Sequence, residues 1–257
     1  MNYEAERGYL IVAGTSESVD YVACAETLAK SLRYWHPDVK ICLVTDAEYS
    51  NPLFNFIKPF PKGNTGGWTT DWQVFLASPF HETVKLEADM VVSGPVEHWW
   101  TLYRNKPVWI SSGCRNYHGA VSTKRTYRKI FDKNNLPDVY NAVTYWRMSK
   151  ESQVFFQTVK HLFENWEQEK TILQGAKDEH ANTDLIYALS NDNFTTPIGP
   201  QIVHMKPSIL GTQTEDWSKE LVWEIVNGVL RINGHSQSGF VHYNQKHLAK
   251  SFGECYG

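Results

Sequence analysis

The sequence contains few cysteines, and they are widely separated. The four cysteines among the 257 residues are Cys24, Cys42, Cys114 and Cys255, and no two of them form a CxxC pair. Thiols this scattered predict neither a zinc finger nor a disulfide framework. A reducing, cytoplasmic setting is therefore the simplest prediction.

Long hydrophobic runs are also missing. No stretch approaches the roughly 20 consecutive apolar residues that a bilayer-spanning helix needs. Residues 1–7 carry acidic side chains and lack the apolar segment of a secretory signal. We therefore expect neither a membrane span nor a signal peptide.

A strong charge of either sign, internal repeats and low-complexity linkers are absent as well. The formal net charge is -3, with 42% apolar and 21% charged residues, which is ordinary globular composition. Nothing in the overall charge demands nucleic acid or an anionic membrane as a partner. The length and composition predict one domain over residues 1–257.

The first half of the chain alternates strands and helices. An apolar run at 8–13 predicts a buried strand, and Ser18 can cap a following helix that Pro37 would stop. A second strand is expected at 40–45, closed by Asp46. Such a βαβ unit of about 40 residues implies a parallel sheet, and ligands of these sheets bind at the carboxyl ends of the strands.

The later segments favour a smaller antiparallel part. An Asn-Gly pair at 227–228 separates two apolar runs and predicts a hairpin with a type I′ turn. The fold class expected is α/β, with a mostly parallel sheet and a smaller antiparallel C-terminal part. Further helices are expected at 71–77, 150–166 and 178–190, and further strands at 83–86, 108–111 and 240–243.

Two carboxylates follow the predicted strand at 83–86. Glu87 and Asp89 are two residues apart, so their side chains lie on the same side of an extended chain. Two neighbouring carboxylates stay ionised together only with a cation or ample water nearby. A hard divalent ion that also binds phosphates could be bound by these two carboxylates. A solvated strand end without any function would show the same pair of residues.

The segment around this pair resembles a known motif. Residues 78–92 are similar to the DxD segment of the glycogenin-like family of retaining glycosyltransferases, which have the GT-A fold. That family typically shows an apolar strand, a D-A-D or D-S-D triplet and another short apolar run. Glu87 stands where the family has aspartate, so the first carboxylate is one methylene longer.

Other segments resemble the family in the same order along the chain. Residues 10–15 resemble its first strand and nucleotide-contacting loop, and 140–143 resemble the turn that faces the donor sugar, with Val143 in place of glycine. Residues 182–184 resemble a later acidic turn. The resemblance implies that the nucleotide and its phosphates are bound by Ala13, Gly14, Thr15, Tyr21, Asp46 and Lys246, and that Ala142 lines the donor sugar.

The resemblance also implies the metal and catalytic residues. Glu87, Asp89 and His242 would hold the metal, and His204 is the alternative to His242 as the histidine ligand. Asn141 and Asp184 would line the donor sugar and are the candidate catalytic residues. Lys250 is an alternative to Lys246, because the family's H-x-x-G-x-x-K-P-W pattern is not reproduced.

The activity implied is metal-dependent transfer of a sugar to a hydroxyl group. The donor would be a nucleotide sugar, expected to be a UDP-sugar, the cofactor Mn²⁺ or Mg²⁺, and the outcome retention. The alternative is a non-catalytic protein with this fold that binds a nucleotide or carbohydrate. Glu87 and Val143 favour this alternative, because both depart from the motifs of the family.

The acceptor stays open between three classes. Residues 101–133 contain eight basic residues and one acidic residue, a local net charge of +7. This segment predicts either a solvated basic helix face or a surface for a polyanion. The acceptor is accordingly a glycan, a small hydroxyl compound, or a hydroxymethylated base in DNA that would have to be extruded from the duplex.

Overall fold

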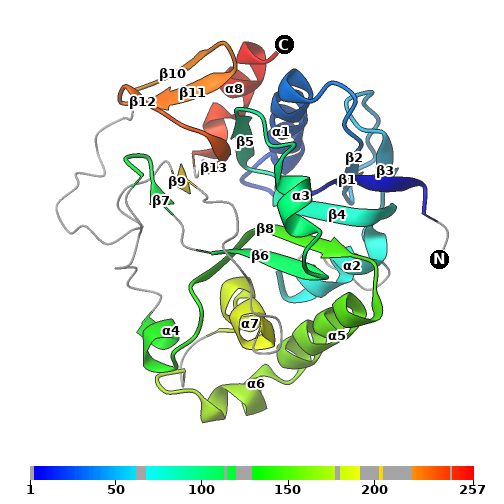
Figure 1. Cartoon of the computed structure of the whole chain (residues 1–257), viewed down its shortest axis with the longest axis vertical. Coiled ribbons are helices and arrows are strands. Elements are labelled where there is room, and N and C mark those ends of the chain that lie inside the picture. The colour runs from blue at the N-terminus through cyan, green and yellow to red at the C-terminus, as the bar shows by residue number, and fades with distance from the viewer. Residues whose placement is uncertain are drawn as a thin grey trace.

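A six-stranded sheet forms the centre of the molecule (Figure 1). The computed structural model describes residues 3–61, 68–112, 115–119, 129–176, 180–191, 203–204, 222–243 and 245–257. The sheet has the order β3-β2-β1-β4-β8-β6, and its first four strands are parallel, while β8 runs antiparallel to both neighbours. The strands are β1 Ala5–Val12, β2 Ile41–Val44, β3 Phe56–Lys58, β4 Phe80–Glu87, β6 Val108–Ser112 and β8 Val139–Arg147.

Two smaller sheets contain the other strands that the structure describes. A four-stranded sheet has the order β5-β13-β9-β7, and a three-stranded antiparallel sheet has the order β10-β11-β12. Their strands are β5 Met90–Ser93, β7 Arg115–Asn116, β9 Val203–His204, β10 Trp223–Val226, β11 Val229–Ile232, β12 His235–Ser236 and β13 Gly239–His242. The chain is thus an α/β protein with a mostly parallel central sheet and smaller sheets beside it, as predicted.

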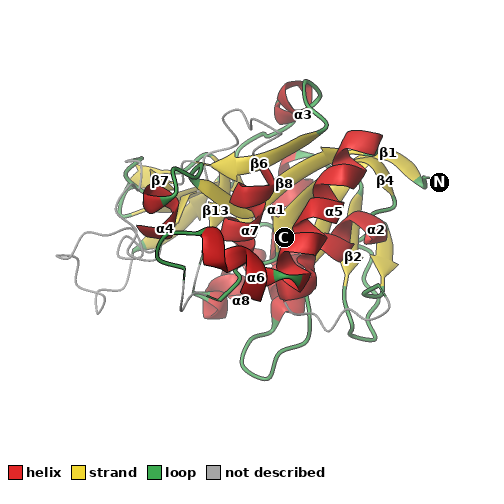
Figure 2. Ribbon diagram, turned by 90° about the horizontal axis from the view of Figure 1, so that it is seen from below, coloured by secondary structure: helices red, strands yellow, loops and turns green. Residues whose placement is uncertain are grey.

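Helices cover both faces of the central sheet. In Figure 1, α1 lies on one side of the sheet and α5 and α7 on the other, and Figure 2 shows α5 and α7 from their own side. The α-helices are α1 Tyr21–Trp35, α2 Val74–Ala77, α3 Trp99–Tyr103, α4 Lys129–Lys133, α5 Lys150–Glu164, α6 Trp166–Glu169, α7 Thr183–Ser190 and α8 Ala249–Cys255. The 3₁₀ helices are η1 Trp68–Gln73, η3 Lys170–Ile172 and η6 Lys246–Leu248. Within the described residues, no helix combines the length and apolarity needed to cross a bilayer.

The alternation of side chains along β1 explains this two-sided arrangement. Tyr9 and Ile11 pack with the buried residues of α1, whereas Leu10 packs in the cluster that contains α5 and α7. Successive side chains of a strand point to opposite faces, so a run that is apolar throughout is buried on both. Gly8 leaves room for the Phe80 ring of β4, because a Cβ there would lie 2.4 Å from that ring.

The predicted βαβ unit is confirmed, with one correction at the start of its helix. The helix α1 begins at Tyr21, and the Asp20 carboxylate accepts a hydrogen bond of 2.9 Å from the Ala23 backbone N–H. Asp20 rather than Ser18 is therefore the cap. Both residue types cap helices well, so the sequence alone could not separate two candidates two positions apart.

The predicted hairpin is confirmed together with its turn. Asn227 and Gly228 have φ values of +51° and +75°, which is the left-handed pair that a type I′ turn requires. The strand predicted at 240–243 exists as β13, but it pairs antiparallel with β5. The third strand beside the hairpin is β12 instead.

The prediction of a turn at residues 140–143 is wrong. These residues lie inside β8, which pairs with β4 on one side and β6 on the other. Most of β8 is buried on both faces, so it lacks the polar and apolar alternation that would have revealed it. Its position next to β4 brings Asn141 close to the end of that strand.

Candidate functional site

The polar residues predicted for the site meet at the carboxyl end of β4. The strand ends at Glu87, and the Asp89 backbone carbonyl then accepts a hydrogen bond of 3.0 Å from the Tyr243 N–H just after β13. A cavity of about 400 Å³ opens there. Its lining includes Val12, Tyr21, Asp71, Lys85, Glu87, Ala88, Asp89, Tyr140, Thr183, His242 and Lys246.

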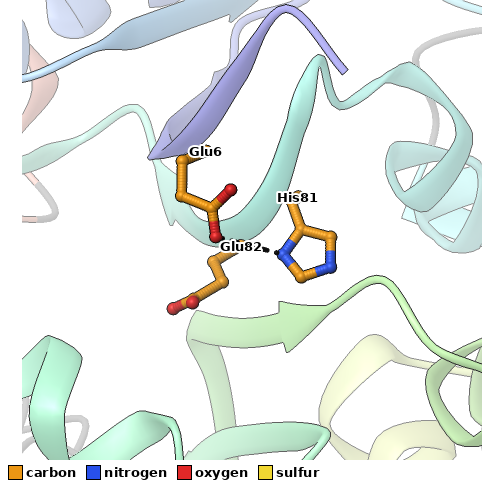
Figure 3. Close-up of side chains that lie close together, drawn as sticks. All are labelled: Glu6, His81 and Glu82. Atoms are coloured by element: carbon orange, nitrogen blue, oxygen red, sulfur yellow. Dashed lines mark ion pairs between the residues drawn. The ribbon is translucent and has the colours of Figure 1, made fainter. Parts of the chain in front are cut away.

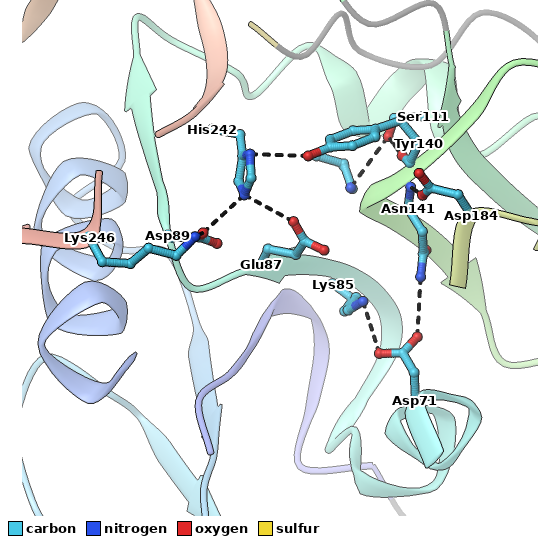
Figure 4. Close-up of polar contacts among 11 residues, drawn as sticks. Asp71, Lys85, Glu87, Asp89, Ser111, Tyr140, Asn141, Asp184, His242 and Lys246 are labelled. Atoms are coloured by element: carbon cyan, nitrogen blue, oxygen red, sulfur yellow. Dashed lines mark hydrogen bonds and ion pairs between the residues drawn. The ribbon is translucent and has the colours of Figure 1, made fainter. Parts of the chain in front are cut away.

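Glu87, Asp89 and His242 form a compact group (Figure 4). The Nε2 atom of His242 lies 3.2 Å from a Glu87 carboxylate oxygen and 3.1 Å from a carboxylate oxygen of Asp89. One ligand atom from each of the three residues lies within 4.8 Å of the others. Two carboxylates and one imidazole so arranged can surround a single divalent ion.

The neighbours of this group fix its charge and orientation. The Tyr140 hydroxyl lies 3.1 Å from His242 Nδ1, and the Lys246 ammonium lies 2.7 Å from Asp89 Oδ2 (Figure 4). Burial by itself raises the pKa of Asp89, but His242 and Lys246 outweigh it and hold that pKa below its usual value. Burial lowers the pKa of His242, and the adjacent carboxylates raise it above its usual value. These contacts favour the charged form of the Asp89 carboxyl group, which is the form that binds a cation.

A second polar network, which the sequence did not predict, is centred on Asp71. Its carboxylate lies 3.0 Å from the Lys85 ammonium and accepts hydrogen bonds from Asn141 Nδ2 at 3.2 Å and the Tyr187 hydroxyl at 2.7 Å. Lys85 is buried and Asp71 is largely shielded from solvent, with 5% of the Lys85 side chain and 12% of the Asp71 side chain exposed. The signal available in the sequence was Lys85 itself, because a lysine inside an apolar strand needs a buried partner.

The network reaches both candidate catalytic residues. The backbone N–H of Asn141 donates a hydrogen bond of 2.7 Å to the Asp184 carboxylate, and Thr144 donates to the Asn141 side-chain oxygen. Asn141 and Asp184 are therefore held together beside the cavity. Ala142 differs from its predicted role, because its side chain is 1% exposed and belongs to the hydrophobic core.

Four of the residues predicted to contact the nucleotide, Ala13, Gly14, Thr15 and Asp46, lie just after β1 and β2, whereas Tyr21 begins α1 and Lys246 begins η6. Ala13 donates a backbone hydrogen bond of 2.9 Å to the Val44 carbonyl, next to Gly14. The hydroxyl and the backbone N–H of Thr15 each donate a hydrogen bond of 2.7 Å to Asp46. Burial raises the pKa of Asp46, and the hydrogen bonds that it accepts together lower that pKa below its usual value.

A further group of possible ligands occurs at the opposite end of β1 and β4. Figure 3 shows Glu6, His81 and Glu82, with His81 Nδ1 3.5 Å from a Glu6 carboxylate oxygen. The buried Glu82 carboxylate already accepts hydrogen bonds of 3.1 Å from the Arg104 guanidinium, which neutralises its charge. This group therefore offers a weaker cation site than the one at Asp89.

The basic segment 101–133 is not one helix. Its described residues belong to α3, β6, β7 and α4, and α3 and α4 lie far apart in both Figure 1 and Figure 2. Arg104 pairs with Glu82, and Arg115 donates a hydrogen bond of 2.7 Å to the Gly119 carbonyl. Lys124, Arg125 and Arg128, on which the polyanion prediction chiefly rests, lie outside the described residues.

Comparison with known proteins gives matches in structure but not in sequence. No protein-family model and no curated protein sequence matches the chain. The galactosyltransferase LgtC, solved in complex with donor and acceptor sugar analogs, is 12% identical, with a TM-score of 0.53 over 97% of this chain and 95% of that one. An active-site mutant of LgtC gives the same TM-score of 0.53 at 12% identity, over 96% and 94% of the two chains. Mouse xyloside xylosyltransferase 1 gives a TM-score of 0.45 at 12% identity, over 74% and 82%.

The two LgtC structures bear on the fold. They match this chain over 97% and 96% of its length. At 12% identity, the two matches show a shared fold and say nothing about substrate or mechanism. The chain therefore has the GT-A fold of the glycosyltransferases that its motifs resemble.

Proposed function

We propose that this protein is a metal-dependent glycosyltransferase that moves a sugar from a nucleotide sugar, a UDP-sugar, to a hydroxyl acceptor. The observation that supports this most directly is the meeting of Glu87, Asp89 and His242 at the end of β4. Those three residues come from two distant parts of the sequence, and they meet where α/β sheets bind ligands. The residues that line this cavity extend from Val12 to Lys246, so we treat 1–257 as one catalytic unit.

The donor set fits a manganese or magnesium ion. Carboxylate oxygens suit both ions, and the imidazole nitrogen of His242 is a ligand that Mn²⁺ accepts more readily than Mg²⁺ does. Such an ion would neutralise charge on the departing nucleoside diphosphate. Lys246, on the far side of Asp89, would contribute a second positive charge to the diphosphate oxygens.

The Asp71 network supplies the rest of the transfer site. Asp71 anchors Lys85, which lines the cavity, and the buried Asn141, whose backbone in turn anchors Asp184. These contacts would hold the wall of the donor-sugar site in a fixed arrangement. In the reaction, the bond between the anomeric carbon and the diphosphate breaks and a bond from the acceptor oxygen forms on the same face. The acceptor proton passes to the leaving diphosphate. Asn141 and Asp184 would hold the wall against which the sugar is oriented through this step.

The acceptor we propose is a glycan or a small hydroxyl compound. Among the described residues, nothing favours DNA, because the basic residues of 101–133 are distributed over separate elements. The donor-binding side, in contrast, has polar groups suited to a nucleotide: Thr15 and Asp46 are joined at the end of the sheet, and the Tyr21 ring lines the cavity.

A non-catalytic binding protein with the same fold is the second candidate. Glu87 in place of aspartate favours it, because the longer side chain changes the geometry of the metal site. An enzyme should hydrolyse its nucleotide-sugar donor slowly without any acceptor and only with metal present, whereas a binding protein should not.

A thermal-shift panel of nucleotide sugars tests the proposal directly. A ligand that binds only the native state stabilises the protein by about 2.7 kcal/mol at a concentration 100 times its dissociation constant. We expect UDP-sugars to raise the Tm with Mn²⁺ present and much less with EDTA. If no nucleotide sugar shifts the Tm under either condition, the proposal is wrong.

The identity of the third metal ligand is a separate prediction. The backbone of His204 in β9 is the register partner of His242 in β13, so the two histidines are neighbours in the sheet. We expect His242→Ala to raise the Mn²⁺ concentration needed for donor hydrolysis roughly 10- to 100-fold, the order typical for a group that supports a metal site. His204→Ala is the matched control and should leave that requirement near the wild-type value. A raised requirement in His204→Ala alone would reverse the assignment.

A further inference from the structure

A second cavity lies at the other end of β5 and β13. Its volume is about 780 Å³, against about 400 Å³ for the cavity at Asp89. Gly239 of β13 lines it, and His242 follows three residues later on the same strand. Three residues of strand span about 10 Å, so the second cavity is near the transfer site and separate from it.

Aromatic rings and imidazoles form much of its wall. Trp99 is half-buried in the short helix α3, while Trp109 and Tyr117 are buried. His118 and His235 are exposed at its rim, with His118 Nδ1 3.2 Å from His235 Nε2. These rings offer flat apolar surfaces with polar edges, which suit a ligand that has an apolar face and many hydroxyl groups.

One buried polar group in the wall of this cavity lacks a partner. The Trp109 ring nitrogen is buried and has no hydrogen-bond partner within the described part of the chain. Buried polar groups are normally paired, so a donor left unpaired at a cavity wall indicates a position where a ligand or a water accepts. Arg115, Asn116 and Gln237 also line the cavity, and each of these planar side chains already makes a hydrogen bond within the chain.

The charges of the side chains that line this cavity limit the kinds of ligand that it can bind. None of the described residues that line the cavity is acidic, and its ionisable groups are one arginine and three histidines. A hard cation such as Ca²⁺ or a basic peptide does not fit, because neither finds a carboxylate there. An uncharged or acidic polyhydroxy compound does.

We propose that this second cavity is a saccharide-binding site distinct from the transfer site. The pyranose ring presents an apolar C–H face that packs on Trp99, while its hydroxyls exchange hydrogen bonds with the imidazoles and planar polar groups around it. Its position along β13 suits a glycan that extends away from the transfer site. The inference rests on the proposed function in one respect only, namely that this glycan also carries the acceptor hydroxyl group.

A glycan array followed by titration calorimetry tests the proposal. The labelled full-length protein is applied to an array of neutral and acidic glycans, and the strongest binder is then measured in solution. We expect Trp99→Ala and the double variant His118→Ala with His235→Ala each to weaken its affinity about tenfold or more, the order of one lost aromatic contact. Trp99→Phe keeps a ring and should retain most of the affinity.

Controls separate this inference from the proposed transfer activity. Tyr3→Ala removes an exposed aromatic ring outside the cavity and should bind glycans as the wild type does. The cavity variants should keep metal-dependent donor hydrolysis, because they leave Asp89 and His242 intact. No glycan binding by the wild type, or binding that all the cavity variants retain, overturns the proposal even if donor hydrolysis is found. Glycan binding without donor hydrolysis instead counts against the transferase.

Discussion

Asp89→Asn is expected to lower metal-dependent hydrolysis of the donor by about 100- to 1,000-fold, the loss typical when one group that stabilises developing charge is removed. Asp89 is 6% exposed and its carboxylate contacts both His242 and Lys246. Asparagine keeps the shape and one acceptor oxygen, but it brings no charge to the ion. The rate is measured by release of the nucleoside diphosphate at saturating donor and Mn²⁺.

Asp38→Asn is the matched control for this substitution. Asp38 is exposed and follows the last turn of α1, whereas Tyr21, the first residue of that helix, lines the cavity. Fifteen helical residues separate the two ends by about 22 Å, so the control changes the same net charge far from the site. Hydrolysis by Asp89→Asn at the wild-type rate, with metal present, would refute the metal-site assignment.

The part of the site that could be predicted was local in sequence. Glu87 and Asp89 follow directly from an apolar strand, and a period of two places both carboxylates on one side. The first βαβ unit was predictable for the same reason, since its apolar periodicities and its stop signals lie within about 40 residues. Local patterns of this kind decide which elements form.

The distant partner of the acidic pair could not be derived from periodicity. His242 is 153 positions after Asp89, and the two meet only because β13 pairs with β5 so that His242 lies opposite Met90. Nothing in either strand specifies the other as its partner, because both are short apolar runs that many strands would fit. The resemblance to a family, rather than the pattern, suggested His242.

The Asp71 network was missed because its members act through tertiary contacts. In the sequence, Asp71 has the position of an acidic residue in the first turn of a helix, and Tyr187 has that of a residue on the apolar face of a helix. Their partnership appears only when α7 packs near η1 and the buried strand β8 brings Asn141 between them. Lys85 was the exception, because a lysine inside an apolar strand predicts a buried partner, although the strand does not say which residue that is.

Lys85→Met is expected to lower the free energy of unfolding by about 3 kcal/mol, the lower end of the range for breaking a buried ion pair. The substitution leaves the Asp71 carboxylate buried without its cation. The Tyr187 hydroxyl and the Asn141 amide still donate to it, which keeps the loss from being larger. Urea unfolding with linear extrapolation measures the change. Lys58→Met is the control, because Lys58 pairs with Glu4 on the surface and such pairs contribute about 1 kcal/mol or less.

The double variant Lys85→Met with Asp71→Asn shows whether the loss comes from the ion pair itself. Asparagine at position 71 removes the uncompensated charge and keeps an oxygen that can accept from Tyr187 and Asn141. The double variant should therefore be more stable than Lys85→Met alone, with a coupling energy of about 1–3 kcal/mol between the two sites. Strictly additive losses would mean that the ammonium and the carboxylate do not interact. The donor-induced Tm shift should stay small in the double variant even where stability recovers, because the positive charge of Lys85 at the cavity wall is still missing.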